Sequence, residues 1–280
     1  MSQESKESTA VVLGGGGLAG IGWTIGVLAA LEEAGALRLA AADHVIGTSA
    51  GAAVAAAVLQ AGAGAEYDRV VRKARRNTEL APAVSLADIL PDVLAVHGAD
   101  ASLAEKAGRL AVLSRERSGT DPALRREAIA GRLQKDAWPD ARLSVTAVRA
   151  DGEPVVFTAD SGVSLVDALT ASCAVPGLWP VATIDGADYV DGGTFSLTNA
   201  ELAAHADRVL VLRPQPELPV YVTPERQQVL DRAVVIEPSE RARAGFGSDP
   251  FDPDVRGVAA VLGYEDGLAA VSAVASLTGK

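Results

Sequence analysis

The stretch HVIGTSAGAAVAAAVLQA at residues 44–61 decides the fold of this chain. Its first five residues form a short run with β-branched side chains, and residues 50–61 form a longer run rich in alanine. Runs of the first kind predict strands and runs of the second kind predict helices. We therefore predict a strand over 44–48, a sharp turn at Ser49 and a helix over 50–61. Gly47 and Gly51 flank the serine and leave room for a tight turn.

The same pattern occurs once upstream. Residues 9–13 are a short β-branched run, residues 14–20 have the sequence GGGGLAG, and an apolar helix is predicted from there to about Gly35, which suits a helix C-cap. A strand–helix–strand–helix order at this spacing predicts a parallel sheet that is covered on both faces. The expected fold class is therefore α/β, with three layers and a mainly parallel central sheet.

The rest of the sequence indicates that the chain forms a single domain. Residues 66–136 have few strand signals and are expected to form a helical insertion beside the site. Arg142–Ala150 and Pro154–Thr158 predict a hairpin that turns at Asp151-Gly152. Further strands are expected at 182–184, 188–190, 208–213 and 234–236, and helices at 165–174 and near the C-terminus. Because the sequence has no repeats or long linkers, we expect a disordered tail at 1–8 and a single domain at 9–280.

Composition disfavours several function classes. The 280 residues carry 25 basic and 36 acidic side chains, a net charge of −11, and phosphate contacts with nucleic acid need a basic surface. Cys173 is the only cysteine, so no intrachain disulfide can form and a reducing compartment is expected. Residues 1–8 are polar and lack the apolar segment of a secretory signal, which predicts a cytoplasmic location. The apolar runs at 18–31 and 50–59 are shorter than a membrane span.

Ser49 is the candidate nucleophile. A serine in the pattern Gly-x-Ser-x-Gly lies on a strained strand-to-helix turn, which projects its Oγ from the start of the helix. The five-residue pattern also occurs by chance, so a plain tight turn is the alternative. Here a strand-like run precedes Ser49 and an alanine-rich helix follows it, which is the context that a nucleophile requires.

The glycine-rich loop has two interpretations. Gly15, Gly17 and Gly20 fit the dinucleotide-binding pattern, but that pattern needs an acidic residue at the end of the second strand, where this chain has Gly47-Thr48-Ser49. The other interpretation is an oxyanion hole, in which the N–H groups of Gly15, Gly16 and Gly17 open a helix. One such donor is worth roughly 3–4 kcal/mol in a transition state. We favour the oxyanion hole; a nucleotide site or a simple packing turn are the alternatives.

A nucleophilic serine needs a base. The three histidines are His44, inside a predicted strand, His97, in the helical insertion, and His205. The order Ser49, Asp191, His205 matches that of α/β hydrolases, but residues 200–207 predict an ordinary helix. Asp191 instead ends a predicted strand before Gly192 and Gly193, where a carboxylate can approach closely. A partly desolvated carboxylate can accept the serine proton directly, so Asp191 is the preferred base.

Taken together, these motifs resemble the patatin-like phospholipase family of acyl hydrolases. The resemblance implies a Ser49–Asp191 dyad, an oxyanion hole at Gly15 to Gly17, and lipid acyl-ester hydrolysis without a metal or cofactor. Two positions depart from the family's pattern: Ala19 stands where many members have a basic residue, and residues 194–199 (TFSLTN) replace paired asparagines and a proline. The resemblance runs from about residue 9 to 213 and is carried by Gly14–Gly20, residues 26–35 (GVLAALEEAG), Gly47–Gly51, residues 171–177 (ASCAVPG) and Asp191-Gly192-Gly193.

The expected substrate is therefore a lipid or another acyl ester, with the insertion forming a trough for the acyl chain. A basic cluster on one predicted helix is expected to be either a solvated face or a contact with an anionic membrane surface. Two other functions stay open at this point: a lipid- or partner-binding protein with little turnover, and a nucleotide-binding oxidoreductase. The cluster comprises Arg69, Arg72, Lys73, Arg75 and Arg76.

Overall fold

The structure is a computed structural model that describes residues 7–72, 79–139 and 142–279. Eight strands form one sheet in which β3, β2, β1, β7 and β8 run parallel, while β4, β5 and β6 pair antiparallel. The parallel strands are short and apolar because both faces of the sheet are covered. In sheet order the strands are β5 (Ala182–Ile184), β6 (Ala187–Asp191), β3 (Leu143–Arg149), β2 (His44–Thr48), β1 (Thr9–Leu13), β7 (Arg208–Leu212) and β8 (Val234–Ile236), with β4 (Pro154–Phe157) paired to β3.

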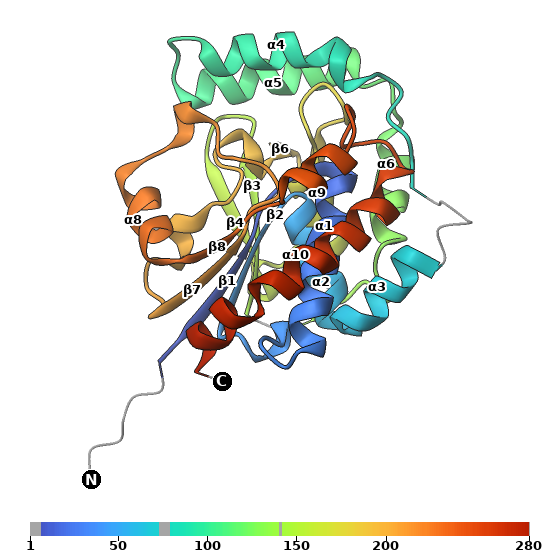
Figure 1. Ribbon diagram of the computed structural model, residues 1–280. Helices are drawn as coiled ribbons and strands as arrows, with labels where there is room; N and C mark the ends of the chain where they lie inside the picture. Colours follow the sequence, from blue (N-terminus) through green and yellow to red (C-terminus); the bar gives the residue numbers. More distant parts are fainter. Residues whose placement is uncertain (1–6, 73–78, 140–141, 280) are drawn as a thin grey trace.

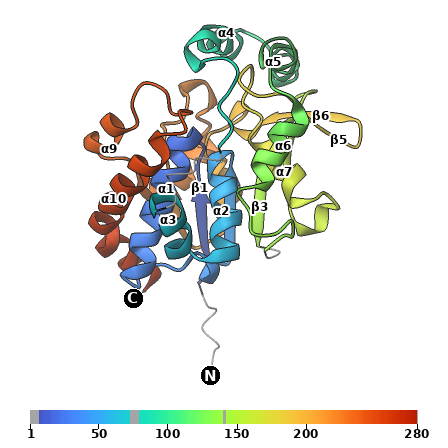
Figure 2. The same ribbon diagram turned by 90° about the vertical axis from the view of Figure 1, so that its right-hand side faces the viewer.

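Helices cover the sheet unequally, as Figures 1 and 2 show. One face carries a thick layer that includes α1, α2, α3, α7 and α10, whereas the other carries α8 and a short 3₁₀ turn. The helices are α1 (Gly17–Glu33), α2 (Ala50–Ala61), α3 (Ala63–Arg72), α4 (Leu86–Gly98), α5 (Leu103–Arg117), α6 (Pro122–Ala130), α7 (Leu165–Ser172), α8 (Pro224–Arg232), α9 (Glu240–Gly245) and α10 (Val255–Thr278). The 3₁₀ turns are η1 (Leu39–Ala41), η2 (Ala159–Ser161), η3 (Gly192–Thr194), η4 (Ala200–Ala203) and η5 (Pro219–Tyr221).

Helix α10 packs closely along α1. A Cβ atom at Gly22 or Gly26 of α1 would overlap the backbone of α10, and one at Gly263 of α10 would overlap that of α1. The Trp23 indole N–H donates to Asp266 at 2.8 Å across this contact. Within the described part of the chain, α10 is the one helix that is long and apolar enough to span a membrane. About a third of the residues in its most apolar segment are buried inside the protein.

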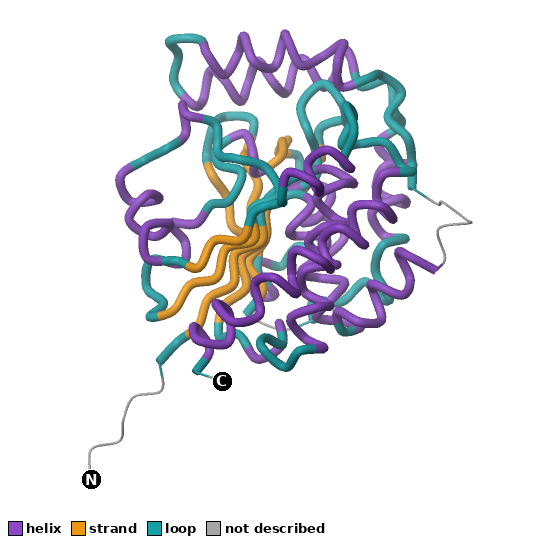
Figure 3. The backbone as a smooth tube through the Cα atoms, in the orientation of Figure 1, coloured by secondary structure: helices purple, strands orange, loops and turns teal. Residues whose placement is uncertain are grey.

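Helices α4 and α5 lie across the carboxyl-terminal edge of the sheet (Figures 1 and 3). Ala107 and Ala111 of α5 pack on Val148 of β3 and Val190 of β6. Ile89 of α4 packs on Trp179, which lies in the loop after α7. Parallel strands deliver their connecting loops to this edge, so the two helices cover the region where sites form in open α/β sheets.

The expected fold class is confirmed, and the predicted elements at 9–13, 44–48, 50–61 and 234–236 have the observed bounds. Three expectations differ from the structure. Helix α3, expected in the insertion, packs on α1 and α10 within the main layer. Residues 200–203 form a 3₁₀ turn instead of an ordinary helix. Ser8, expected in a disordered tail, hydrogen-bonds Asp207, while residues 1–6 of that tail lie outside the described residues.

Candidate active site

Ser49 occupies a sharp turn between β2 and α2. Its φ is +52°, a left-handed value that costs about 1–3 kcal/mol for a non-glycine residue and persists only where the surroundings impose it. A Cβ atom at Gly51 would overlap the Leu13 carbonyl, and one at Gly47 would overlap the backbone of Ala52. The two flanking glycines are therefore required by the close approach of the backbone around the serine.

The backbone of Ser49 is held from α7. Its N–H donates to the Ser172 hydroxyl at 2.9 Å, and Ser172 is fully buried. Ser49 itself is 7% exposed. The backbone of Ser49 is thus held in place, and the residue lines two adjoining cavities.

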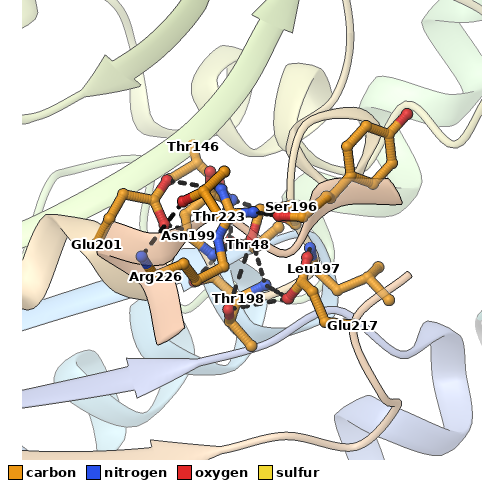
Figure 4. Close-up of polar contacts among 11 residues, drawn as sticks. Thr48, Thr146, Ser196, Leu197, Thr198, Asn199, Glu201, Glu217, Thr223 and Arg226 are labelled. Atoms are coloured by element: carbon orange, nitrogen blue, oxygen red, sulfur yellow. Dashed lines mark hydrogen bonds and ion pairs between the residues drawn. The ribbon is translucent and has the colours of Figure 1, made fainter. Parts of the chain in front are cut away.

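A buried polar network supports the strand end before Ser49 (Figure 4). The Thr146 hydroxyl donates to Thr48 Oγ1 at 2.9 Å, and the Asn199 amide donates to Thr48 Oγ1 at 2.9 Å and to Thr146 Oγ1 at 3.2 Å. All three residues are buried. Because an unmade bond at such a depth is costly, this network fixes the relative position of β2, β3 and residue 199.

The segment at 194–199, where the sequence departs from the family's pattern, forms a wall of the site. The Glu217 carboxylate accepts hydrogen bonds from the N–H groups of Leu197 at 2.7 Å and Thr198 at 3.2 Å (Figure 4). In turn the Leu197 carbonyl accepts from the Gly15 N–H at 2.8 Å. This segment therefore joins the glycine loop to the end of β6.

Asp191 ends β6 and lies on the same cavity as Ser49. Its Oδ1 accepts from the Gly193 N–H at 2.7 Å, and its Oδ2 has no partner of regular geometry among the described residues. Burial raises the pKa of the Asp191 carboxyl to about 7, against the opposing effects of the nearby Ser49 hydroxyl, the Gly193 N–H and the Arg125 charge. The structure thus brings the predicted serine and carboxylate together, with the carboxylate desolvated.

The glycine loop opens α1 beside Ser49. Among the described residues, the N–H groups of Gly16 and Gly17 have no hydrogen-bond acceptor, as expected for the first turn of a helix. Gly17 has a φ of +65°. The structure differs from expectation at Gly15, because its N–H is engaged by Leu197 and is not directed at the site. Two of the three predicted oxyanion donors are therefore available.

An apolar trough of about 200 Å³ leads away from Ser49. Helix α4 contributes much of its wall, and the remaining wall comes from the glycine loop, residues 175–176, residues 193–197 and the loop at 250–251. The volume is below the ~300 Å³ at which small-molecule pockets begin, so the trough suits a single chain of modest length. The α4 side chains that line it are Leu86, Ile89, Leu90, Val93, Leu94 and His97.

His97 was not assigned a role from sequence, and it lines this trough. Its ring hydrogen-bonds the Tyr221 hydroxyl, which connects α4 to η5. Burial, with a smaller contribution from Lys106, lowers the pKa of His97 to about 4, so the ring is neutral at pH 7. The pairing has no local sequence signal, since 124 residues separate the two side chains.

His205 lies far from the serine. Its ring packs on His44 with centroids 4.3 Å apart, and His44 begins the strand that Ser49 follows. At about 3.3 Å per residue, the length of β2 separates this histidine pair from Ser49 by roughly 16 Å. The geometry therefore provides no Ser49–His205 hydrogen bond.

Residues 11–204 match the family described as patatin-like phospholipase, a range that includes the glycine loop, Ser49 and Asp191. No curated protein sequence matches the chain. Among solved structures, VipD from Legionella pneumophila is similar at 15% identity and a TM-score of 0.43, with 96% of this chain and 67% of VipD covered. The type III effector protein ExoU is similar at 17% identity and a TM-score of 0.42, with 96% of this chain and 53% of ExoU covered.

Proposed function

This chain belongs to the patatin-like phospholipase family, and on that premise we propose that it cleaves fatty-acyl esters through Ser49 and Asp191. Family membership supports lipid acyl hydrolysis as the class of activity. The observation that carries the finer proposal is local: a serine at a strained turn faces a desolvated carboxylate at one end of an apolar trough. We propose an esterase of the phospholipase A type without a cofactor.

The proposed first step forms an acyl-enzyme. The Asp191 carboxylate accepts the Ser49 proton while Oγ bonds to the ester carbonyl carbon, and the carbonyl oxygen becomes an oxyanion. The N–H groups of Gly16 and Gly17 donate to that oxyanion, each worth roughly 3–4 kcal/mol. When the tetrahedral intermediate collapses, the ester C–O bond breaks and the departing alcohol takes the proton from Asp191.

The second step reverses these roles with water. Asp191 accepts a proton from water as the water oxygen bonds to the acyl carbon. The bond between that carbon and Ser49 Oγ then breaks, the fatty acid leaves, and Oγ takes the proton back from Asp191. A base works best when its pKa is close to the working pH, and burial raises the pKa of Asp191 to about 7. A single carboxylate can therefore serve in both steps without a histidine.

The test is hydrolysis of p-nitrophenyl esters of increasing chain length. We expect Ser49→Ala and Asp191→Asn each to lower kcat/KM by at least about 1,000-fold, because both belong to one catalytic unit. His205→Ala is the matched control, since its ring packs on His44 far from the site, and it should keep the parent's activity. Full activity in Ser49→Ala would contradict the proposal. Lipid binding without any turnover by the parent would instead favour the binding-protein alternative.

Several expectations from sequence stay predictions. These are the single domain at 9–280, the cytoplasmic location and the peripheral membrane contact. Part of the basic cluster proposed for that contact, including Lys73, Arg75 and Arg76, lies outside the described residues. Arg69, which is described, pairs with Glu66 at 2.6 Å.

A further inference from the structure

A buried arginine lines a second, smaller pocket at Ser49, to which α4 contributes no residue. Arg125, on α6, is 4% exposed, and its guanidinium carbon lies 3.7 Å from the centroid of the Trp179 ring. One nitrogen, Nη2, donates to the Cys173 carbonyl at a long 3.4 Å. Stacking on tryptophan and one weak hydrogen bond are the contacts that hold this cation.

The other two nitrogens of Arg125 lack partners. Within the described ranges, neither Nε nor Nη1 has a hydrogen-bond acceptor, although both are buried. The nearby Glu79 carboxylate is bonded to Arg132 at 2.8 Å and also to Arg256. Nε and Nη1 of Arg125 therefore carry three buried N–H groups without an acceptor among the described residues.

The unpartnered nitrogens are energetically costly because the Arg125 guanidinium is charged. Burial, aided by the Arg132 charge, lowers the pKa of Arg125 to about 9, so the guanidinium is still protonated at pH 7. A buried cation without hydrogen-bonded anions is costly, and the Glu79 and Asp191 carboxylates act on Arg125 through space, without a hydrogen bond. An anion bound in the pocket beside the guanidinium would offset that cost.

Arg125 faces a small pocket that adjoins the trough at the serine. This pocket of about 20 Å³ is lined by Ser49, Arg125, Trp179 and Phe251, and it shares Ser49, Gly17 and Phe251 with the trough. A single water needs roughly 10–15 Å³ of such space, so the pocket admits one or two oxygen atoms of an anion and no acyl chain. If the acyl chain fills the trough, the alcohol side of the ester lies toward Arg125.

We propose that Arg125 and its pocket form a subsite for a terminal phosphate on the alcohol side of the scissile ester. This inference rests on the proposed function and specifies its substrate: a lysophosphatidic-acid-like phosphate monoester is preferred to a neutral ester. A guanidinium matches the oxygens of phosphate in geometry and charge. A phosphocholine group is less favoured, because its bulky substituent would have to extend out of a pocket of about 20 Å³.

The test compares esters with the same acyl chain below their micelle concentrations. We expect the parent to cleave lysophosphatidic acid with a kcat/KM about 10- to 100-fold above that for the matching monoacylglycerol, and above that for lysophosphatidylcholine, since a charge-assisted hydrogen bond has about that worth. Arg125→Met should abolish this preference. Arg126→Met is the matched control: the neighbouring arginine carries the same charge but pairs with Asp167 at the surface, and it should keep the preference.

Other outcomes would overturn the subsite. If Arg125→Met lowered kcat/KM equally for all three esters, the role of Arg125 would be to stabilise the Asp191 carboxylate or the fold, and not to bind phosphate. Equal cleavage of lysophosphatidylcholine and lysophosphatidic acid by the parent would contradict the size argument, and this measurement needs no variant.

Inorganic phosphate separates the subsite from the proposed hydrolysis. Phosphate should raise the Tm of the parent and of Arg126→Met but not of Arg125→Met. If phosphate gave the same Tm shifts but the parent cleaved no ester, the anion site would be supported and the proposed hydrolysis would be contradicted. Phosphate binding combined with no preference for lysophosphatidic acid would mean that the site takes the free ion, which would overturn the lipid assignment.

Discussion

At the scale of single residues, the account depends on the protonation of Asp191. Its carboxyl is buried beside Ser49, and burial raises its pKa to about 7, so the carboxylate required as base forms only as the pH approaches neutrality. The Arg125 charge opposes this rise. Activity and stability should therefore respond to pH in opposite directions around this one group.

The first prediction concerns activity. For a neutral p-nitrophenyl ester, kcat/KM should increase with pH and level off above a midpoint near 7, because the free enzyme must hold a deprotonated Asp191. Arg125→Met should move that midpoint upward, since the substitution removes a charge that stabilises the carboxylate. A midpoint near 4 in both proteins would contradict the desolvated base. The measurement is a pH–rate profile of each variant.

The second prediction concerns stability. The folded-state pKa of Asp191, about 7, exceeds the unfolded value near 3.9. The native state therefore binds the extra proton between these values, and the stability contributed by Asp191 falls as the pH rises through that window. Asp191→Asn carries no charge, so its Tm should exceed that of the parent at pH 8 and match it at pH 4. Calorimetry at both pH values measures the difference; a lower Tm for the variant at pH 8 would contradict the account.

At the scale of elements, α4 sets the size of the trough. Its apolar side chains face the cavity, and the His97–Tyr221 hydrogen bond joins the end of α4 to η5. Both groups are neutral at pH 7, since burial lowers the pKa of His97 to about 4 and raises that of Tyr221 to about 12. The wall is thus held by a neutral contact at neutral pH.

The third prediction follows from this wall. Leu90→Trp should fill part of the trough and lower kcat/KM for long-chain esters about 10- to 100-fold while changing acetate hydrolysis little, because each buried CH₂ is worth about 0.8 kcal/mol. Val112→Trp, on the exposed side of α5, is the control and should leave the chain-length profile as it is. An unchanged profile in Leu90→Trp would show that the acyl chain binds elsewhere. The p-nitrophenyl ester series gives both profiles.

At the scale of the whole molecule, α1 carries the glycine loop and is braced by α10, the last helix of the chain. The contact depends on glycines, because a Cβ at Gly22 would overlap the Arg256 carbonyl. The position of the proposed oxyanion donors, Gly16 and Gly17, therefore depends on packing between segments more than 200 residues apart, which the Trp23–Asp266 hydrogen bond also joins.

The fourth prediction tests this bracing. Gly22→Ala should lower the free energy of unfolding by about 1–3 kcal/mol, because the added methyl group forces α1 and α10 apart. Gly108→Ala, in the interior of α5 where the added Cβ makes an ordinary contact, should instead gain about 0.5–1 kcal/mol from helix propensity. Urea denaturation compares the two. Equal effects of the same sign would contradict the proposed role of the α1–α10 contact.

The features that could be predicted from the sequence are those that depend on a short local pattern. Ser49 and its strand and helix follow from one strand–turn–helix signal, and Asp191 from a strand end before two glycines. Arg125 and His97 could not be found in this way, since their roles arise from partners distant in the chain, Trp179 and Tyr221. The engagement of the Gly15 N–H was missed for the same reason: its acceptor, Leu197, comes from another segment.

Trapping of the acyl-enzyme would show directly whether Ser49 is the nucleophile and Asp191 its base. A p-nitrophenyl ester is mixed with excess enzyme, the reaction is stopped with acid within the first turnover, and the digested protein is examined by mass spectrometry. We predict one acyl group on the peptide that contains Ser49, formed at least about 100-fold more slowly in Asp191→Asn and at the parent's rate in His205→Ala. Acylation of another residue, or acylation of Ser49 at the parent's rate in Asp191→Asn, would contradict the Ser49–Asp191 mechanism.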